Sequence, residues 1–390
     1  MIIIKKSFGL ILSIAAQCAF GQTELKTVNI TAPSSAITWD KSSLKQVSPK
    51  GVGANYARII QLSNTNLLCV YEGGGGIQCT TSKDLGKTWL PPAQVAFSTP
   101  GVNMAVPEIL ELKDHSLLVS YNPRPYKLNG SYDTARHFAI VTKKSFDQGK
   151  TWQEERTVYQ ASYSFEDGCW EPAQIQLPSG EILLFYSDEG VYRHSDEQNI
   201  SIFKSMDNGL TWTKYPKIVS FTPGHRDGMP VPIILRGTNE LLFSIEDNSK
   251  GQFKPSIIRN KIETIGLKPV GPVDPERISA LTPDLPDTIY AGAPYLRQLH
   301  SGATILSYQG TQNRLNKWEE ACMQVAIGNN KGENFVNTAL PFIIPLNDHG
   351  LWNSLCVLND DTVIAITSTN AYTEYNAIWI IKGHLANKKN

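Results

Sequence analysis

The octapeptide SKDLGKTW (residues 82–89) returns as SFDQGKTW (residues 145–152) and SMDNGLTW (residues 205–212), and a decayed copy, GNNKGENF, occupies residues 328–335. A repeat of this kind indicates a repetitive architecture. In each copy the Asp bonds nearby backbone N–H groups, the Gly supplies a positive φ, and Thr and Trp begin a strand. The pattern therefore predicts hairpin turns held by a buried Trp, in which the aspartates are structural rather than catalytic.

A second repeat lies between these turns, where a short strand, a polar turn and a more apolar strand recur as a β-hairpin. The six copies begin at Tyr56, Val106, Glu171, Met229, Ala293 and Trp352. Six such hairpins, some followed by a second hairpin carrying the octapeptide, make six blades of about four strands each. We therefore expect an all-β, six-bladed β-propeller, whose last blade is closed by a strand within residues 27–47.

The N-terminus has the pattern of an export signal. Lys5 and Lys6 precede a mostly apolar run at residues 8–20, which is shorter than the roughly 20 residues that span a bilayer. We interpret residues 1–21 as a signal peptide and residues 22–390 as a single propeller domain. The mature protein is then periplasmic or secreted, with no membrane association.

The amino-acid composition limits the classes of molecule that the protein is expected to bind. The 36 Lys+Arg and 36 Asp+Glu cancel, so no charge excess indicates nucleic acid or an anionic membrane, whereas 8 Trp and 15 Tyr suit a sugar. No Cys or His spacing is typical of a metal site, and we expect neither metal nor cofactor. Cys69 and Cys79 are expected to be free buried thiols. We expect a monomer that acts on an oligosaccharide or polysaccharide.

Strand order places the second-strand ends and the first-strand starts on the face opposite the octapeptide turns. The second-strand ends are all polar: Glu72, Asn122, Asp188, Glu246, Gln309 and Ser368. The first-strand starts include Tyr56, Arg58, Asn103, Glu171, Arg226, Asp227 and Trp352. A polar ring with interleaved aromatic residues predicts a small-molecule pocket.

Two carboxylates from adjacent blades meet in this pocket. Glu171 starts the third blade and Glu246 ends the second strand of the fourth. Glycoside hydrolysis uses such a pair, one to protonate the departing oxygen and one to attack the anomeric carbon or activate water. We expect the indole of Trp170 to raise the pKa of Glu171, making it the acid/base, and Arg226 to keep Glu246 ionised as the nucleophile.

Two alternatives stay open for this pair. In one, Glu171 only forms a salt bridge, with Arg193 or Arg226. In the other, its partner is a different carboxylate, for which the candidates are Glu72, Asp188 and Glu189.

The octapeptides resemble the Asp-boxes of the sialidase/BNR superfamily, and longer stretches resemble the exo-α-1,5-L-arabinanase family, glycoside hydrolase family 93. Those stretches are residues 168–172 (GCWEP) with 186–189 (YSDE), 226–230 (RDGMP) with Glu246, 292–295 (GAPY) with 307–309 (SYQ), and 351–355 (LWNSL). The resemblance spans nearly the whole mature chain. Cys169 and Pro232 depart from the family pattern and leave the exact glycan open.

The resemblance implies a retaining enzyme that works from a chain end of linear arabinan and releases arabinobiose without a metal. Glu171 and Glu246 stand at the positions of its catalytic pair, and Tyr308 would be a pocket residue. The substrate-binding candidates are thus Tyr56, Arg58, Asn103, Trp170, Asp188, Arg226, Asp227, Tyr308 and Trp352.

Two other functions suit the same fold. A sialidase clamps a carboxylate with three arginines and uses a Tyr nucleophile assisted by a Glu. Here only Arg58 stands in a comparable motif, and Arg259, Arg297 and Arg314 are the candidates to complete a triad. The third possibility is a propeller that binds a glycan without cleaving it, since fold does not fix function.

Overall fold

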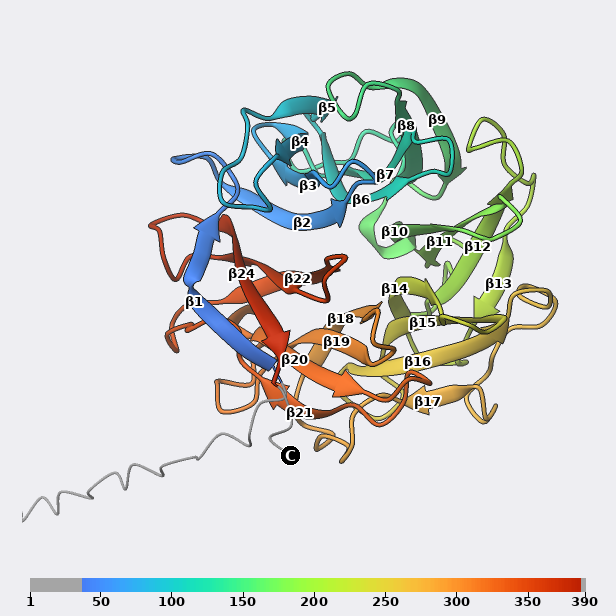
Figure 1. Cartoon of the computed structure of the whole chain (residues 1–390). Helices are drawn as coiled ribbons and strands as arrows, with labels where there is room; N and C mark the ends of the chain where they lie inside the picture. The colour runs from blue at the N-terminus through green and yellow to red at the C-terminus, as the bar shows by residue number, and fades with distance from the viewer. Residues whose placement is uncertain (1–36, 387–390) are drawn as a thin grey trace, which may run out of the picture. The chain divides into compact units, whose positions relative to one another are not determined.

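The computed structural model describes residues 37–386, which form twenty-four strands in six four-stranded antiparallel sheets. The sheets stand as blades around a central axis, with β2, β6, β10, β14, β18 and β22 innermost (Figure 1). The predicted all-β, six-bladed propeller is therefore confirmed. The predicted signal peptide, residues 1–21, lies outside the described residues, among which no helix is long and apolar enough to cross a membrane.

Five blades follow the chain in order, each built from four consecutive strands. The first blade contains β2 (Ala54–Gln61), β3 (Leu67–Gly73), β4 (Gly76–Ser82) and β5 (Ala93–Phe97), and the second contains β6 (Val102–Glu111), β7 (Leu117–Pro125), β8 (Ala139–Ser145) and β9 (Gln153–Gln160). The third contains β10 (Cys169–Gln176), β11 (Ile182–Asp188), β12 (Asn199–Ser205) and β13 (Lys217–Ser220), and the fourth contains β14 (Asp227–Ile234), β15 (Glu240–Asp247), β16 (Lys254–Lys261) and β17 (Arg277–Ser279). The fifth contains β18 (Ala291–Gln298), β19 (Thr304–Gly310), β20 (Cys322–Gly328) and β21 (Val336–Ala339). Two short 3₁₀ helices, η1 (Phe165–Asp167) and η2 (Trp318–Glu320), lie in connections.

The sixth blade joins both ends of the described chain. It contains β22 (Gly350–Val357), β23 (Val363–Thr369) and β24 (Ala377–Leu385), and β1 (Ile37–Gln46) pairs antiparallel with β24. In Figure 1 the blue β1 lies beside the red β24. The expected closure of the last blade by the N-terminal strand is confirmed.

Apolar side chains between successive blades form the core. Phe185 of the third blade and Phe243 of the fourth are both fully buried, with ring centroids 5.2 Å apart. Burying a side chain of this size contributes about 1.5–3 kcal/mol. Because each sheet is buried on both faces, strands such as β11 and β15 are largely apolar, and their charged residues lie only at their ends.

The octapeptide turns have the predicted Asp bonds, but Trp89, Trp152 and Trp212 are only partly buried and precede the fourth strand rather than begin it. In the first, Asp84 accepts the backbone N–H of Thr88 at 2.9 Å and its hydroxyl at 2.6 Å, while Ser82 accepts the N–H of Gly86 at 2.7 Å. Asp147 and Asp207 make the same bonds in the other two full copies. All three turns connect a third strand to a fourth, which confirms the structural role of these aspartates.

The buried cysteines are all free, as expected. Cys69 pairs across β3 and β4 with Thr80, and Cys79 pairs with Val70. The two thiols therefore do not lie opposite each other in the ladder.

Candidate active site

Every innermost strand carries the same irregularity. In each blade the pairing of the innermost strand with the second strand changes register at one bulged residue. This bulged residue has a φ between 44° and 54° in all six blades. The six bulged residues are Tyr56, Val106, Glu171, Met229, Ala293 and Trp352. Positive φ is unfavourable for residues with a Cβ, so its occurrence in all six blades marks a region that the surrounding fold holds under strain.

Polar groups on the preceding blade hold most of these bulges. The bulge N–H donates to the side chain at the end of the preceding blade's second strand in five cases. The pairs are Tyr56 with Ser368, Val106 with Glu72, Met229 with Ser187, Ala293 with Glu246, and Trp352 with Gln309. The polar ring predicted from the sequence therefore links the blades around the axis.

The bulged residues also make the floor of a pocket. Tyr56, Val106, Met229 and Ala293 form one buried apolar cluster, against which Trp352 packs. Glu171 is the only charged residue among the six bulges, and it lines a narrow axial cavity with Tyr56 and Met229. Among the bulged residues only Glu171 thus brings a charge to this cavity, whose lining also includes Arg58 and Glu108.

Glu246 is enclosed by two glycines. Gly228 is its cross-strand partner, and a Cβ there would lie 3.0 Å from Glu246 Oε1. A Cβ on Gly292, in the next blade, would lie 2.7 Å from Glu246 Oε2 and 2.4 Å from the hydroxyl oxygen of Tyr290. Both positions have room only for glycine, which brings the carboxyl group close to backbone and to Tyr290.

Glu171 is held by an arginine from the second blade. Arg124 Nη2 donates to Glu171 Oε1 at 3.1 Å, and Arg124 Nε donates to Asn122 Oδ1 at 2.7 Å. The guanidinium carbon also lies 4.8 Å from the ring centre of Trp170. The partner of Glu171 is therefore Arg124, and neither Arg193 nor Arg226 as the sequence suggested.

Burial dominates the electrostatics of both glutamates. It raises the pKa of Glu246 to about 7, helped by the charge of Glu171 and opposed by the Ala293 N–H and by Arg226. It also raises the pKa of Glu171, but here the charges of Arg124 and Arg226 oppose the shift. The two carboxyl groups are thus close enough to interact, and only Glu171 has a directly bonded cation.

Arg226 lies at the edge of this pair. Its guanidinium donates to Glu189, to Asp196 Oδ1 at 2.6 Å and to Gln198 Oε1 at 2.7 Å. Burial raises the pKa of Glu189 to about 7, against the opposing charge of Arg226. Arg226 therefore acts on Glu246 only through space.

An aromatic wall rises beside Glu246. Trp352 lies 5.8 Å, between ring centres, from both Tyr56 on the floor and Trp318 of η2. The side chain of Gln309 joins this wall to the carboxyl group, because it accepts the N–H of Trp352 and donates to the hydroxyl of Tyr290 at 2.7 Å. Trp318 remains 44% exposed at the rim, which leaves a face open to a ligand.

A buried ionic pair also lines this narrow axial cavity. Arg58 is 3% exposed, pairs with Glu108 at 3.3 Å, and stacks on Tyr56 and Tyr295. Arg58, a predicted substrate-binding residue, lines the same narrow cavity as Glu171, but its guanidinium is already paired with Glu108 there.

Three more predicted pocket residues are buried elsewhere. Asp188 is 1% exposed and accepts the hydroxyl of Tyr159 at 3.1 Å, because the cross-strand register gives its ring position to Ser187. Asp227 is fully buried against Arg277. Tyr308 is fully buried in the core, where its hydroxyl accepts a bond from Gln312, so Tyr290 is the tyrosine beside Glu246.

The remaining predicted residues lie on the floor of the pocket, in its aromatic wall or at its rim. Tyr56, Trp352 and Glu171 line the pocket, whereas Asn103 is exposed on the extended start of β6. Trp170 packs between Phe138 and Phe165, with both ring-centre distances 4.8 Å. Its contact with the site runs through Arg124.

Sequence reasoning missed several residues of the site. These are Arg124, Ser187, Gly228, Tyr290, Gly292 and Trp318. One signal pointed to the bulges, since proline directly follows four of the six bulged residues: Pro107, Pro172, Pro230 and Pro294. Proline inside a strand pattern is typical of a bulge or an edge.

The arginines that were candidates for a sialidase triad are bound to other groups, although Arg58 and Arg297 both stack on Tyr295. Arg259 pairs with Glu240 and Glu333, and Arg297 donates to the hydroxyl of Tyr295. Arg314 donates to backbone carbonyls, including that of Ile344 at 3.1 Å. Within residues 37–386, no group of three or more His, Cys, Asp or Glu residues is arranged to hold a metal ion.

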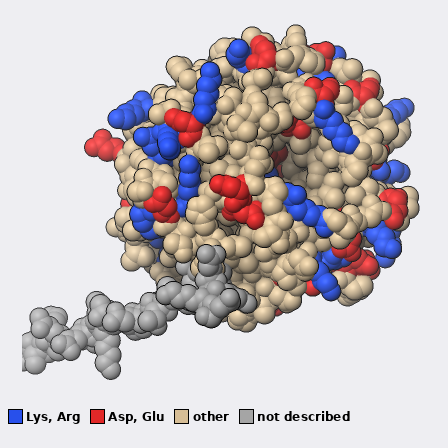
Figure 2. Space-filling model, in the orientation of Figure 1, with Lys and Arg blue, Asp and Glu red and all other residues tan. Residues whose placement is uncertain are grey.

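The surface around the axis carries no field of a single sign. Figure 2 shows one face hollowed near the centre of the ring, with basic and acidic side chains interspersed around it. This agrees with the balanced composition.

Comparisons with known proteins match this architecture. The family described as a BNR repeat-like domain matches residues 126–233, and no curated protein matches the sequence. A protein of unknown function from Dyadobacter fermentans is 14% identical, with a TM-score of 0.69 over 90% of this chain and 100% of its own. The glycoside hydrolase family 93 α-L-arabinofuranosidase of Fusarium graminearum, in complex with arabinobiose, is 17% identical, with a TM-score of 0.64 over 89% of this chain and 98% of its own.

A third solved structure is the NanB sialidase from Streptococcus pneumoniae. It is 10% identical, with a TM-score of 0.59 over 88% of this chain and 71% of its own. The chain therefore carries a BNR repeat-like segment and has the six-bladed propeller fold seen in these arabinofuranosidase and sialidase structures.

Proposed function

We propose that the protein is an exo-acting glycoside hydrolase that releases arabinobiose from linear α-1,5-L-arabinan with retention, using Glu171 and Glu246. The observation that carries this proposal is the pair itself. The two carboxyl groups come from adjacent blades and lie close enough for the charge of Glu171 to act on Glu246, and burial raises the pKa of both. Hydrolysis of a glycoside by two carboxyl groups requires one protonated and one ionised member.

The surroundings favour Glu246 as acid/base and Glu171 as nucleophile, which exchanges the roles expected from the sequence. Both premises of that expectation fail, because Trp170 packs among aromatic rings and Arg226 bonds other groups. Glu246 has a pKa of about 7 and no bonded cation, so it holds its proton near neutral pH. Arg124 favours the ionised form of Glu171.

In this mechanism Glu246 protonates the departing oxygen while Glu171 attacks the anomeric carbon, forming a covalent glycosyl-enzyme. Glu246, now ionised, then removes a proton from the water that hydrolyses the intermediate. No residue outside the pair has to transfer a proton.

The shape of the pocket supports exo action on a sugar chain. Because the floor of bulged residues closes the axis, a chain end fits where the middle of a chain would be blocked. The wall of Tyr56, Trp352 and Trp318 offers apolar faces for sugar rings. The likeness to an arabinofuranosidase solved with arabinobiose supports arabinan as the chain.

The test is to incubate the purified protein with linear α-1,5-arabinan and, separately, with a sialylated oligosaccharide, and to identify products by chromatography. Arabinobiose from arabinan alone supports the proposal. Free sialic acid would establish the sialidase alternative, which the similarity of the fold to the NanB sialidase supports. Binding of either glycan without products would establish the non-catalytic alternative.

We further propose that export through residues 1–21 brings the enzyme to a polysaccharide outside the cytoplasm. N-terminal sequencing of the protein from its host tests this. A mature chain that begins near Gln22 is expected, and a chain that retains Met1 contradicts it.

A further inference from the structure

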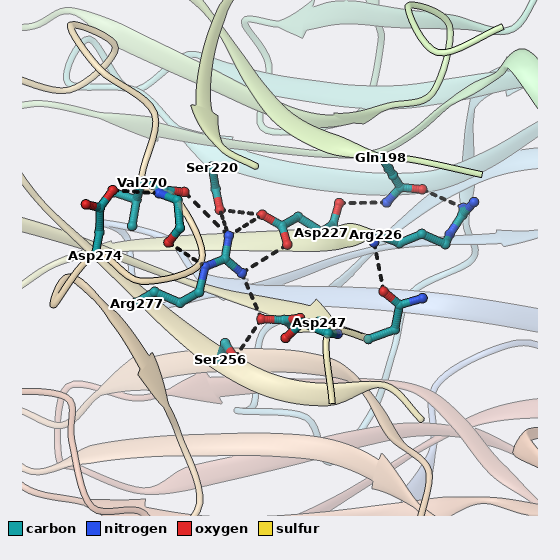
Figure 3. Close-up of polar contacts among 12 residues, drawn as sticks. Gln198, Ser220, Arg226, Asp227, Asp247, Ser256, Val270, Asp274 and Arg277 are labelled. Atoms are coloured by element: carbon teal, nitrogen blue, oxygen red, sulfur yellow. Dashed lines mark hydrogen bonds and ion pairs between the residues drawn. The ribbon is translucent and has the colours of Figure 1, made fainter. Parts of the chain in front are cut away.

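Arg277 occupies an unusual place for a charged residue. It stands on β17, the outermost strand of the fourth blade, yet its side chain is only 6% exposed. Figure 3 shows its guanidinium between Asp227 and Asp247. Nη2 lies 2.6 Å from Asp227 Oδ2, and Nη1 lies 3.0 Å from Asp227 Oδ1 and 2.7 Å from Asp247 Oδ2.

The remaining donors of Arg277 are also used. Nη2 donates to Ser220 Oγ at 2.8 Å, and Nε donates to the carbonyl of Gly271 at 3.2 Å. Ser220 belongs to β13 of the third blade, so the guanidinium bonds two neighbouring blades at once. A planar fork with five N–H groups can serve this arrangement, and an ammonium group cannot.

The two aspartates need this cation. Asp227 and Asp247 are direct cross-strand partners at the end of the β14–β15 hairpin, with side chains 0% and 5% exposed. Like charges opposite each other in a ladder repel, and burial strengthens the repulsion. Without Arg277, the hairpin end would hold two unshielded carboxylates, so either one takes a proton or the strands separate.

The same hairpin end carries the catalytic machinery one residue away. The next cross-strand pair is Gly228 with Glu246, whose side chain faces the opposite side of the sheet from that of Asp247. On the other strand Arg226 precedes Asp227, and Figure 3 shows it turned away from Arg277 toward Gln198. Fixing the two aspartates on one side therefore fixes Glu246 and Arg226 on the other.

We propose that Arg277 is a positioning residue for the catalytic pair, which holds the β14–β15 hairpin end so that Glu246 lies between Gly228 and Gly292. The proposal rests on the proposed function for its role in catalysis. Arg277 acts through Asp227 and Asp247 and does not touch the pocket. Nothing in the sequence around Arg277 indicates this, because its strand has only three residues.

The test compares two conservative variants, Arg277→Lys and Arg259→Lys. Arg259 is a matched control, since it stands on β16 of the same blade as Arg277 and bridges Glu240 of that blade to Glu333 of the next, near the octapeptide face. Lysine keeps the charge in both variants, so each is expected to fold, which a cooperative thermal transition checks. Arabinan hydrolysis is then measured as kcat and KM across pH 4 to 9.

For Arg277→Lys we expect kcat to fall at least tenfold, KM to change less than threefold, and the basic limb of the kcat/KM profile to move to lower pH. Glu171, Arg226 and Tyr290 are the ionisable groups that act on Glu246, and none of them is altered. Arg259→Lys should leave kcat and the profile unchanged. Wild-type kcat and pH profile in Arg277→Lys, or an equal loss in Arg259→Lys, would overturn the proposal.

A second readout does not depend on activity. Carbon-13 labelling of the Glu carboxyl carbons gives a titration curve for Glu246, assigned by its absence in Glu246→Gln. Its midpoint is expected near pH 7 in wild type and at least half a pH unit lower in Arg277→Lys. If wild type hydrolyses no glycan, the proposed function fails, and this titration alone decides whether Arg277 positions Glu246: an unchanged midpoint overturns that claim.

Discussion

The two faces of the propeller use carboxyl groups in opposite ways. On the octapeptide face the pKa of Asp84 is lowered, chiefly by the bond from the Thr88 hydroxyl. For Asp147 and Asp207 burial opposes the shift, but bonds from Thr and Ser outweigh it. On the pocket face, burial raises the pKa of Glu171 and Glu246.

The number of hydrogen-bond donors explains the difference. Asp147 accepts bonds from Ser145, Lys150 and Thr151, which satisfy both of its oxygens. Glu246 accepts one backbone N–H, that of Ala293, and its carboxyl group lies close to Gly228 and Gly292. A well-solvated or well-bonded carboxylate stabilises a fold, whereas a poorly bonded one costs stability and keeps a proton available.

The largest expected effect is the difference in activity between variants of the pocket face and a variant of the octapeptide face. Glu171→Gln and Glu246→Gln should each lower kcat on linear arabinan by about 10³-fold, within the range of lost acid–base or nucleophilic catalysis. Asp84→Asn should leave kcat within about twofold. Steady-state assays of all three variants measure this, and an Asp84→Asn loss as large as the others would contradict the division.

The same variants separate the two glutamates. An aryl arabinofuranoside with a good leaving group needs little protonation, so Glu246→Gln should still form the glycosyl-enzyme, seen as a burst of phenol. Glu171→Gln should give no burst. The opposite pattern would restore the roles expected from the sequence.

A second effect concerns stability and pH. Burial raises the folded-state pKa of Glu246 from 4.5 to about 7. Its protonated form is therefore favoured in the fold, and the contribution of Glu246 to stability is highest below pH 4.5 and falls as pH rises to about 7. Above that pH the ionised group costs about 3 kcal/mol. Glu246→Gln should unfold at higher urea than wild type at pH 8 and at nearly the same urea at pH 4. An advantage equal at both pH values would contradict this linkage.

A third effect tests how closely the backbone surrounds Glu246. In Gly292→Ala the added methyl group would meet Glu246 Oε2 and the Tyr290 hydroxyl, so one of them must move. Misplacing a catalytic group by about 1 Å costs up to about a hundredfold in rate, and kcat/KM should fall tenfold to a hundredfold. Gly53→Ala is the control, because nothing lies within 4 Å of that Cβ. Equal activity of the two variants would show that the enclosure is not tight.

Most of the fold was predictable because its signals are local. The Asp, Gly and Trp of each octapeptide determine a turn within a few residues, and residues 145–152 adopt the bonds that this chemistry predicts. Strand order then assigned Glu171 and Glu246 to one face in adjacent blades. The structure agrees, since the charge of Glu171 acts on Glu246.

Contacts between side chains were not predictable in this way. Asp188 was assigned to the ring by its position along a strand, but Ser187 pairs with Trp170, the residue before the bulge, and takes the ring position instead. Tyr308 was assigned from the family resemblance, whereas the ring position belongs to its neighbour Gln309, as strand order predicted. Arg124 was missed because β6 and β7 extend past the ring, which a strand pattern alone does not show. Partners of buried charges depend on such registers and not on spacing in sequence.

The smallest expected effect belongs to the octapeptide face, and the protein itself suggests its size. In the decayed fourth turn Asn330 aligns with the Asp, and the amide oxygen of the preceding Asn329 accepts the N–H groups of Lys331 and Glu333. Asp147→Asn should therefore retain backbone bonds and cost less than Asp147→Ala, which loses them and should destabilise the fold by about 1–2 kcal/mol. Urea unfolding measures both differences, and kcat/KM should stay within about twofold in either variant. If Asp147→Ala instead reduced kcat/KM as strongly as Gly292→Ala, the two faces would be coupled, and the contrast between structural and catalytic carboxylates would not hold.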